Sequence, residues 1–162
     1  MVFLFALLWC SNVSSGNQIF DLSSCNDLSE QQHRTRFSMV SVRFPQRCLD
    51  VANSGKRLVL KKCKASESSQ TFLVVSASDP IQGSNNRTTY HLKSGAHCVS
   101  GLVMTPCSPH IDQLVVLEQI GDHVAVRLSA NRCLVARNKQ SVRSLQCHAN
   151  KNYQLFTLVP HF

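Results

Sequence analysis

The chain has 162 residues, enough for one domain with a hydrophobic core; 43% of them are hydrophobic and 16% are charged. Its formal net charge of +8 at pH 7 indicates acidic partners such as sulfated glycans or anionic membranes, although the same charges also suit solvated strand and loop faces. No stretch approaches the ~20 apolar residues that a transmembrane helix needs, so the sequence predicts no membrane span.

The N-terminus predicts a short secretory signal. Ten apolar residues are followed by the small, polar segment 11–16, although no positive charge precedes the apolar run. We therefore expect a signal peptide at 1–16, with a buried N-terminal strand as the alternative. A polar lead-in follows at 17–36, in which 27–33 has the composition for one or two helical turns.

From Phe37 onward, short β-branched and apolar runs alternate with turn signals. The first group predicts strands at 37–43, 48–51, 57–61 and 71–76, with a turn at 53–55. The second predicts strands at 88–93, 97–99, 102–105 and 113–119. The third predicts strands at 123–129, 133–136, 142–145 and 154–159. No helical periodicity of useful length competes with this pattern.

A loop at 78–86 separates the first two groups of strands. It ends in Asn86-Arg-Thr88, which is an acceptor for N-linked glycosylation in a secreted protein. We therefore predict a glycan on Asn86.

One cysteine-anchored pattern occurs three times. The first copy reads Cys48-Leu-Asp-Val, then Cys63, six residues and Gln70-Thr-Phe72. The third reads Cys133-Leu-Val-Ala, then Cys147, six residues and Gln154-Leu-Phe156. A weaker copy between them reads Cys98-Val-Ser-Gly, then Cys107, five residues and Gln113-Leu-Val115. A period of about 40 residues marks three units packed around one another, and three sets of four strands predict a closed all-β fold with pseudo-threefold symmetry and few exposed edges.

The eight cysteines are typical of an oxidising compartment. Cys10 lies in the predicted signal, and six others fall in pairs within the repeats. Many connectivities are open to six cysteines, but a repeated unit favours the local bridges Cys48–Cys63, Cys98–Cys107 and Cys133–Cys147. Cys25 is then odd, either free or a link to a second chain in a disulfide-linked dimer. No CxxC or HxxxH spacing occurs, so we predict no metal site.

These repeats resemble those of the ricin-B-type β-trefoil (R-type lectin) family, whose last motif position is usually Trp. The resemblance covers about 37–162 and implies a disulfide-stapled β-trefoil of three four-stranded repeats. The run 37–50 is also similar to the cysteine-rich domain of mannose-receptor-type proteins, some of which bind sulfated sugars. Core positions are expected for Phe72, Val115 and Phe156, and hydrogen bonds to the backbone for Gln70, Gln113 and Gln154.

In sugar-binding repeats of that family, the Asp of Cys-x-Asp accepts hydrogen bonds from sugar hydroxyls. An aromatic residue two positions before the second cysteine stacks on the ring, and an Asn-Gln pair completes the pocket. The resemblance gives these roles to Asp50 and Gln70, but Lys61 stands at the stacking position and Ser69 at the Asn position. As an alternative, Asp50 caps a turn or pairs with Arg47 or Lys61.

The other two repeats depart further from the family pattern. The second has Ser100 in place of the Asp and Thr105 at the stacking position. The third has Val135 and Leu145 at these places, although Tyr153 adjoins its glutamine. The first repeat is therefore the predicted binding site.

Positive charge gathers in the outer repeats. Residues 37–78 hold seven cationic and two acidic residues, and residues 121–162 hold six and one. Near the predicted pocket, Lys61, Lys62 and Lys64 favour a sulfated or carboxylated glycan held by ion pairs instead of stacking. Lysine offers point charges without the bidentate geometry of arginine, so such a cluster gives affinity more than specificity.

No motif indicates an enzyme. The sequence contains no Gly-x-Ser-x-Gly, His-Glu-x-x-His or glycine-rich phosphate loop, and its seven histidines follow no repeated spacing. Nucleic acid is disfavoured because the basic residues are not interleaved with exposed aromatics. No cofactor is predicted.

The sequence thus predicts a secreted, extracellular, non-enzymatic glycoprotein with a lectin-like function. Its expected ligands are glycans, acidic or sulfated in preference to neutral, including those of cell-surface glycoproteins. The alternative is a degenerate trefoil that binds a protein partner through its loops, as an inhibitor or a receptor ligand.

Overall fold

The computed structural model describes residues 36–52, 56–65, 67–77, 89–148 and 151–161. This part of the chain is all β. Its strands are β1 (Arg36–Ser41), β2 (Arg47–Ala52), β3 (Arg57–Lys62), β4 (Phe72–Ser76), β5 (Tyr90–Ser94), β6 (His97–Ser100), β7 (Val103–Pro106), β8 (Leu114–Ile120), β9 (His123–Leu128), β10 (Arg132–Ala136), β11 (Val142–Gln146) and β12 (Leu155–His161). Each predicted strand is present, with ends within about two residues of the prediction, as is usual for element boundaries.

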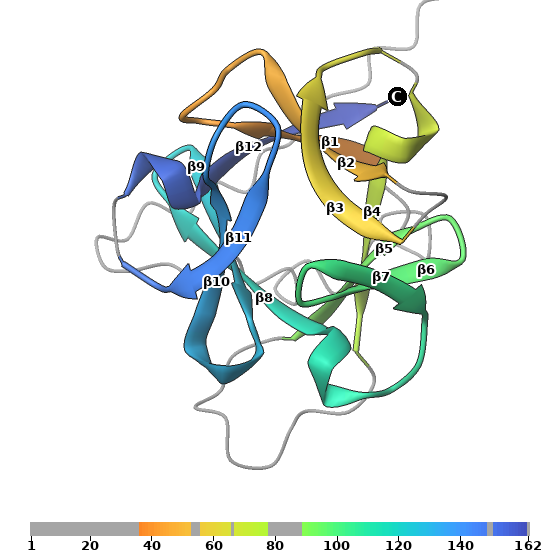
Figure 1. Cartoon of the computed structure of the whole chain (residues 1–162). Coiled ribbons are helices and arrows are strands. Elements are labelled where there is room, and N and C mark those ends of the chain that lie inside the picture. The colour runs from red at the N-terminus through yellow and green to blue at the C-terminus, as the bar shows by residue number, and fades with distance from the viewer. Residues whose placement is uncertain (1–35, 53–55, 66, 78–88, 149–150, 162) are drawn as a thin grey trace, which may run out of the picture.

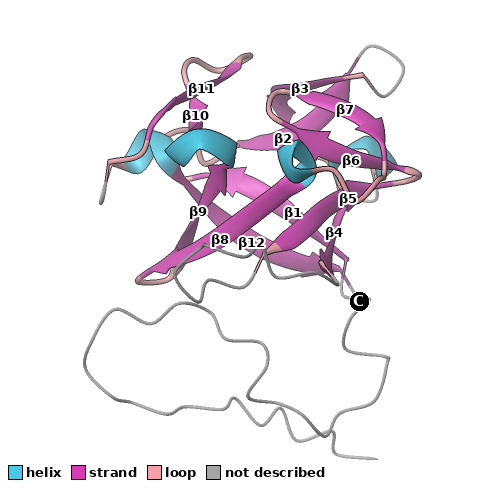
Figure 2. Cartoon of the chain, turned by 90° about the horizontal axis from the view of Figure 1, so that it is seen from below, coloured by secondary structure: helices cyan, strands magenta, loops and turns pink. Residues whose placement is uncertain are grey.

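Six strands pair in a closed ring (Figure 1). Going round it, β1 pairs with β4, β4 with β5, β5 with β8, β8 with β9, β9 with β12, and β12 with β1, all antiparallel. The remaining strands form the hairpins β2–β3, β6–β7 and β10–β11, each attached to one ring strand. Figure 2 shows the three hairpins together at one end of the ring. Ring closure pairs strand edges that would otherwise be open to other chains.

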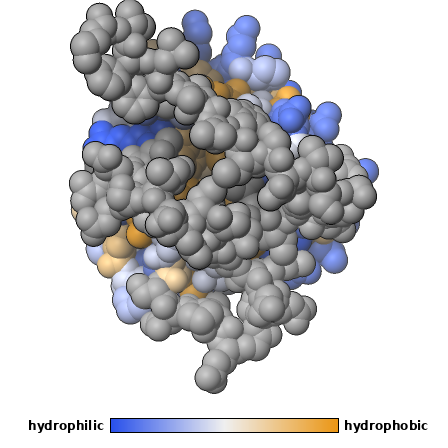
Figure 3. All heavy atoms as spheres, turned by 180° about the vertical axis from the view of Figure 1, so that it is seen from behind, coloured by the Kyte–Doolittle hydropathy of each residue, from blue (hydrophilic) through white to orange (hydrophobic). Residues whose placement is uncertain are grey.

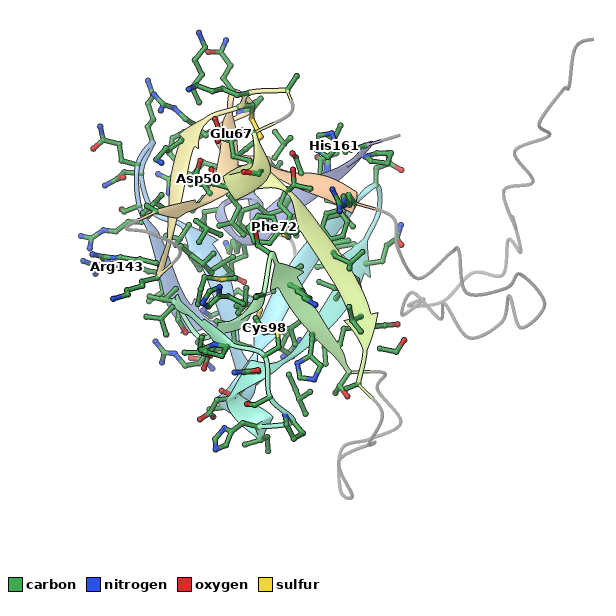
Figure 4. All side chains as sticks on the ribbon, turned by 90° about the vertical axis from the view of Figure 1, so that its right-hand side faces the viewer. Asp50, Glu67, Phe72, Cys98, Arg143 and His161 are labelled. Carbon is green, nitrogen blue, oxygen red and sulfur yellow. A yellow bond between two sulfur atoms is a disulfide. The ribbon has the colours of Figure 1, made fainter. Side chains whose placement is uncertain are left out.

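The ring and the hairpins share one hydrophobic core. Equivalent positions of the three repeats supply it: Leu49, Val99 and Leu134 after the first cysteine, and Phe72, Val115 and Phe156 at the end of each motif, all at most 1% exposed. The predicted core positions are therefore confirmed, and Figure 4 shows Phe72 toward the centre of the molecule. By contrast, the described side chains at the edge of the face seen in Figure 3 are mainly hydrophilic, with smaller apolar areas between them.

The described helices are single 3-10 turns, which the sequence did not predict. They are η3 (Ser68–Gln70), η4 (Ile111–Gln113), η5 (Ser129–Asn131) and η6 (Asn152–Gln154). Three of them end on the glutamine of a repeat; the next strand begins at once after η4 and η6, and one residue later after η3. The tight turns after β6 and β8 use Gly101 and Gly121, whose φ angles of 62° and 60° lie in the left-handed region that favours glycine.

Three disulfides join the cysteines that the repeats pair: Cys48–Cys63, Cys98–Cys107 and Cys133–Cys147. Each ties the first strand of a hairpin to the segment that follows the second strand. The disulfides thereby fix the segments that lead to η3, η4 and η6.

We expect removal of one disulfide to destabilise the fold strongly. Replacing Cys48 and Cys63 by Ser should lower the free energy of unfolding by about 3 kcal/mol, because the unfolded chain gains the freedom of the opened loop. The Cys98→Ser/Cys107→Ser variant opens a loop of sequence separation 9 instead of 15 and should lose slightly less. Urea unfolding measures both values; a clearly larger loss for the shorter loop would contradict the loop-entropy explanation.

Several predictions lie outside the described residues. These are the signal peptide 1–16, the lead-in as far as residue 35, Cys25, the turn 53–55, and the loop at 78–88 with Asn86. They remain predictions, as does a protein-binding role for that loop.

Candidate functional site

Asp50 lies on the side of the β2–β3 hairpin that faces away from the core. Side chains alternate along a strand, so Leu49 enters the core while Cys48 and Asp50 face the opposite way. The segment anchored by the Cys48–Cys63 disulfide, with η3 after it, covers that face, and Asp50 is only 1% exposed. A carboxylate at this depth needs compensating partners.

The two carboxylate oxygens of Asp50 have different partners. Oδ2 accepts hydrogen bonds from Gln70 Nε2 at 3.0 Å and from Ser69 Oγ at 3.2 Å. Lys61 Nζ lies 3.0 Å from Oδ1 and forms an ion pair with it, and Oδ1 has no other polar partner among the described residues. The Lys61 side chain is 54% exposed. One oxygen is thus fixed by the protein, while the other is covered by an ammonium group that solvent reaches.

A cavity of about 320 Å³ opens beside Asp50. Its volume is at the lower end of the range for small-molecule sites, about 300–1,000 Å³. Its lining includes four cationic side chains: Arg47, Lys61, Lys62 and Lys64. The structure brings the five predicted ligand-binding residues together here, since Asp50 and Gln70 line the same cavity.

Arg47, Glu67 and Ser69 also line the cavity but were not predicted as binding residues. Figure 4 shows Glu67 and Asp50 at the same end of the molecule. Glu67 lies in the segment between Cys63 and Gln70, and its closeness in sequence to both is the signal that could have found it.

The cations of the cavity are only partly neutralised. Arg47 and Lys62 are direct cross-strand partners, an arrangement that costs free energy for like charges. Neither forms an ion pair with a carboxylate of the described residues, and Lys64 Nζ lies 3.9 Å from Glu67 Oε2. The cavity therefore carries an excess of positive charge.

Gln70 holds the site together. Its Oε1 accepts a hydrogen bond from Lys64 N at 2.9 Å, and its Nε2 donates to Lys62 O and to Asp50 Oδ2, both at 3.0 Å. Gln113 and Gln154 make the same pair of backbone bonds in their repeats, as predicted. Both amide hydrogens of Gln70 are used within the protein, so its role here is to position Asp50.

The other repeats lack a carboxylate at this place. In strand register, Lys61, Thr105 and Leu145 each lie opposite the first cysteine of their repeat, so they are equivalent positions. Thr105 Oγ1 accepts a hydrogen bond from the amide of its own repeat's glutamine at 2.7 Å. Val135, at the position of Asp50, is 2% exposed and apolar.

Two further properties bear on the kind of site. Within the described ranges, no group of three or more His, Cys, Asp or Glu side chains is placed to hold a metal ion. Nor does any helix of the described part have the length and apolar character required to cross a bilayer.

No protein-family model matches the sequence, and no curated protein matches it. Solved structures do match, at low identity. A mosquitocidal holotoxin aligns with a TM-score of 0.64 and 10% identity, over 80% of this chain and 17% of the toxin. The Polyporus squamosus lectin, bound to the human-type influenza-binding epitope Neu5Acα2-6Galβ1-4GlcNAc, aligns with a TM-score of 0.59 and 12% identity, over 78% of this chain and 49% of the lectin.

ThreeFoil, a designed 3-fold symmetric protein, aligns with a TM-score of 0.57 and 12% identity, over 76% of this chain and 97% of ThreeFoil. The chain therefore spans less than two thirds of the toxin and lectin chains but nearly all of the designed protein. These likenesses define a class: the chain has an all-β, trefoil lectin-like fold.

Proposed function

We propose that residues 37–162 form a ricin-B-type β-trefoil module that binds acidic or sulfated saccharides, without catalysis, in its first repeat. The observation that carries this proposal is the buried Asp50, whose Oδ1 is held, among the described residues, only by the solvent-exposed ammonium of Lys61 at 3.0 Å, in a cavity lined by four cations. The Lys61 side chain is 54% exposed, so a ligand can reach this ion pair from solvent. The tripled cysteine motif and the trefoil lectin-like fold support the family assignment.

The arrangement favours a ligand that carries both a hydroxyl group and an anionic group. The hydroxyl donates to Asp50 Oδ1, and the sulfate or carboxylate pairs with the Lys61 ammonium as it leaves that oxygen. A neutral sugar would separate the Asp50–Lys61 pair without replacing it, which is costly for a buried carboxylate. A neutral sugar would also find no aromatic side chain among the residues that line the cavity.

We further propose that the module acts outside the cell. Three disulfides persist best in an oxidising compartment, and the apolar N-terminus fits a secretory signal. Saccharides of cell-surface or matrix glycoconjugates are then the available ligands.

The test is a glycan array probed at low and at near-physiological salt. We expect binding to sulfated glycans that weakens with salt, since exposed ion pairs are screened. The Lys61→Gln/Lys62→Gln variant should lose roughly 10-fold in affinity, while Lys93→Gln/Lys151→Gln, with the same charge change away from the cavity, should stay within about twofold. A blank array, or salt-insensitive binding to neutral sugars, would contradict the proposal.

A further inference from the structure

We propose that the acidic ligand is a chain, a sulfated polysaccharide that leaves the Asp50 cavity and continues over the tip of the β10–β11 hairpin. This tip is defined as residues 137–141. The inference rests on the proposed function and names the ligand class more narrowly.

The hairpin tip of the third repeat is docked on a strand of the first. Ser141 forms an isolated antiparallel bridge with Val59 in β3, and Leu60 N donates to Gln140 O at 3.1 Å. Figure 1 shows the β10–β11 hairpin beside β3. Because the bridge is antiparallel, Lys61 of β3 lies opposite Lys139 of the tip, each two residues from the bridge. Lys61 lines the cavity, so the tip is directed toward it.

The tip is held rigidly by its own hydrogen bonds. Asn138 Oδ1 accepts three of them, from Gln140 N at 2.9 Å, from Ser141 N at 2.8 Å and from Ser141 Oγ at 2.9 Å. Arg137 N donates to Ser141 O at 3.0 Å. A fixed turn presents Arg137 and Lys139 to solvent in one arrangement, which lowers the ordering cost of binding.

The tip adds unneutralised positive charge to that of the cavity. Arg137 and Lys139 of the tip, and Arg143 next to it in β11, are exposed, and none forms an ion pair with a carboxylate of the described residues. Figure 4 shows Arg143 at the edge of the molecule. Like charges gathered on adjoining strands repel one another. A polyanion laid across the bridge between the two repeats removes that repulsion.

The cavity distinguishes a polysaccharide from other polyanions. When an anionic group of the ligand draws Lys61 away, Asp50 Oδ1 is left to accept a hydrogen bond, which a saccharide hydroxyl donates and a phosphodiester group does not. Single-stranded nucleic acids bind through aromatic side chains that stack on bases. The described residues of the cavity and tip include no aromatic side chain. A sulfated polysaccharide carries both hydroxyl groups, which suit Asp50 in the cavity, and sulfates, which suit the cations of the cavity and the tip.

Heparin-derived oligosaccharides of increasing length test this inference by calorimetry. The wild-type affinity should rise from disaccharide to octasaccharide. The Arg137→Ser/Lys139→Ser variant should lose roughly 5- to 30-fold for the octasaccharide and less than about twofold for the disaccharide, since two exposed ion pairs are removed. The control Arg36→Ser/Lys93→Ser, with the same charge change on ring strands β1 and β5, should stay within about twofold at each length.

Equal losses in the tip and control variants, or an affinity independent of length, would overturn the inference. If disaccharide binding requires Asp50 but the tip variant binds longer oligosaccharides as tightly as wild type, the tip is not part of the binding surface and only the cavity binds. Length-dependent binding that requires the tip but not Asp50 would instead reject the proposed pocket. Binding to phosphatidylserine vesicles without binding to any oligosaccharide would show that the ligand is an anionic membrane surface and not a polysaccharide.

Discussion

The Asp50→Asn variant is expected to keep its fold and to lose roughly 100-fold in affinity for acidic saccharides. Asparagine has nearly the same shape, and its amide oxygen can still accept the hydrogen bond that Gln70 Nε2 donates. Its amide nitrogen would then stand where Oδ1 now faces Lys61, and a nitrogen donor cannot accept a ligand hydroxyl. The binding loss comes from a hydrogen bond to a charged group, which contributes about 1.5–3 kcal/mol.

The matched control is Asp112→Asn, which removes the same charge from an exposed carboxylate of the second repeat. Titration calorimetry with a sulfated saccharide from the array should show an affinity within about twofold of wild type for this control. Urea unfolding should place Asp50→Asn within about 1–2 kcal/mol of wild type. Retained affinity in Asp50→Asn would exclude the carboxylate as a ligand group and reject the proposed site.

The Gln70→Glu variant is expected to be the most destabilising single change at the site. Gln70 is 1% exposed, and its Nε2 donates both to Lys62 O and to the Asp50 carboxylate. A carboxylate in this place cannot donate and would face Asp50 at hydrogen-bond distance. An uncompensated buried charge costs about 3–5 kcal/mol, and the repulsion from Asp50 adds to this cost.

Gln154→Glu separates the two contributions. Gln154 is equally buried and makes the same backbone bonds, but Val135 replaces the neighbouring carboxylate in its repeat. We expect Gln70→Glu to lose at least about 2 kcal/mol more than Gln154→Glu at neutral pH. Urea unfolding at neutral pH measures this excess; equal losses for the two variants would show that Asp50 does not contribute.

Local patterns in the sequence determined most of the fold. Short apolar runs and turn residues located the strands, because strand pairing and turn geometry depend on neighbours in the chain. The tripled motif paired the cysteines and placed Phe72, Val115 and Phe156 in the core. It also identified the three glutamines, since each bonds the segment next to its own second cysteine. The repetition supported these inferences, because the three copies share the same local arrangement of disulfide, core residue and glutamine hydrogen bonds.

The sequence offered the pairing of Asp50 with Lys61 as an alternative, and the β2–β3 register brings these two side chains together. Only the tertiary structure decided the rest of the site, because the contact of Ser69 with Asp50 and the place of Glu67 in the cavity depend on how η3 folds back over β2. The docking of the hairpin tip on β3 brings together residues about 80 positions apart in the sequence, which is about the length of two repeats. Such contacts carry no local signal, because they depend on the shapes of surfaces that meet only once the ring has closed.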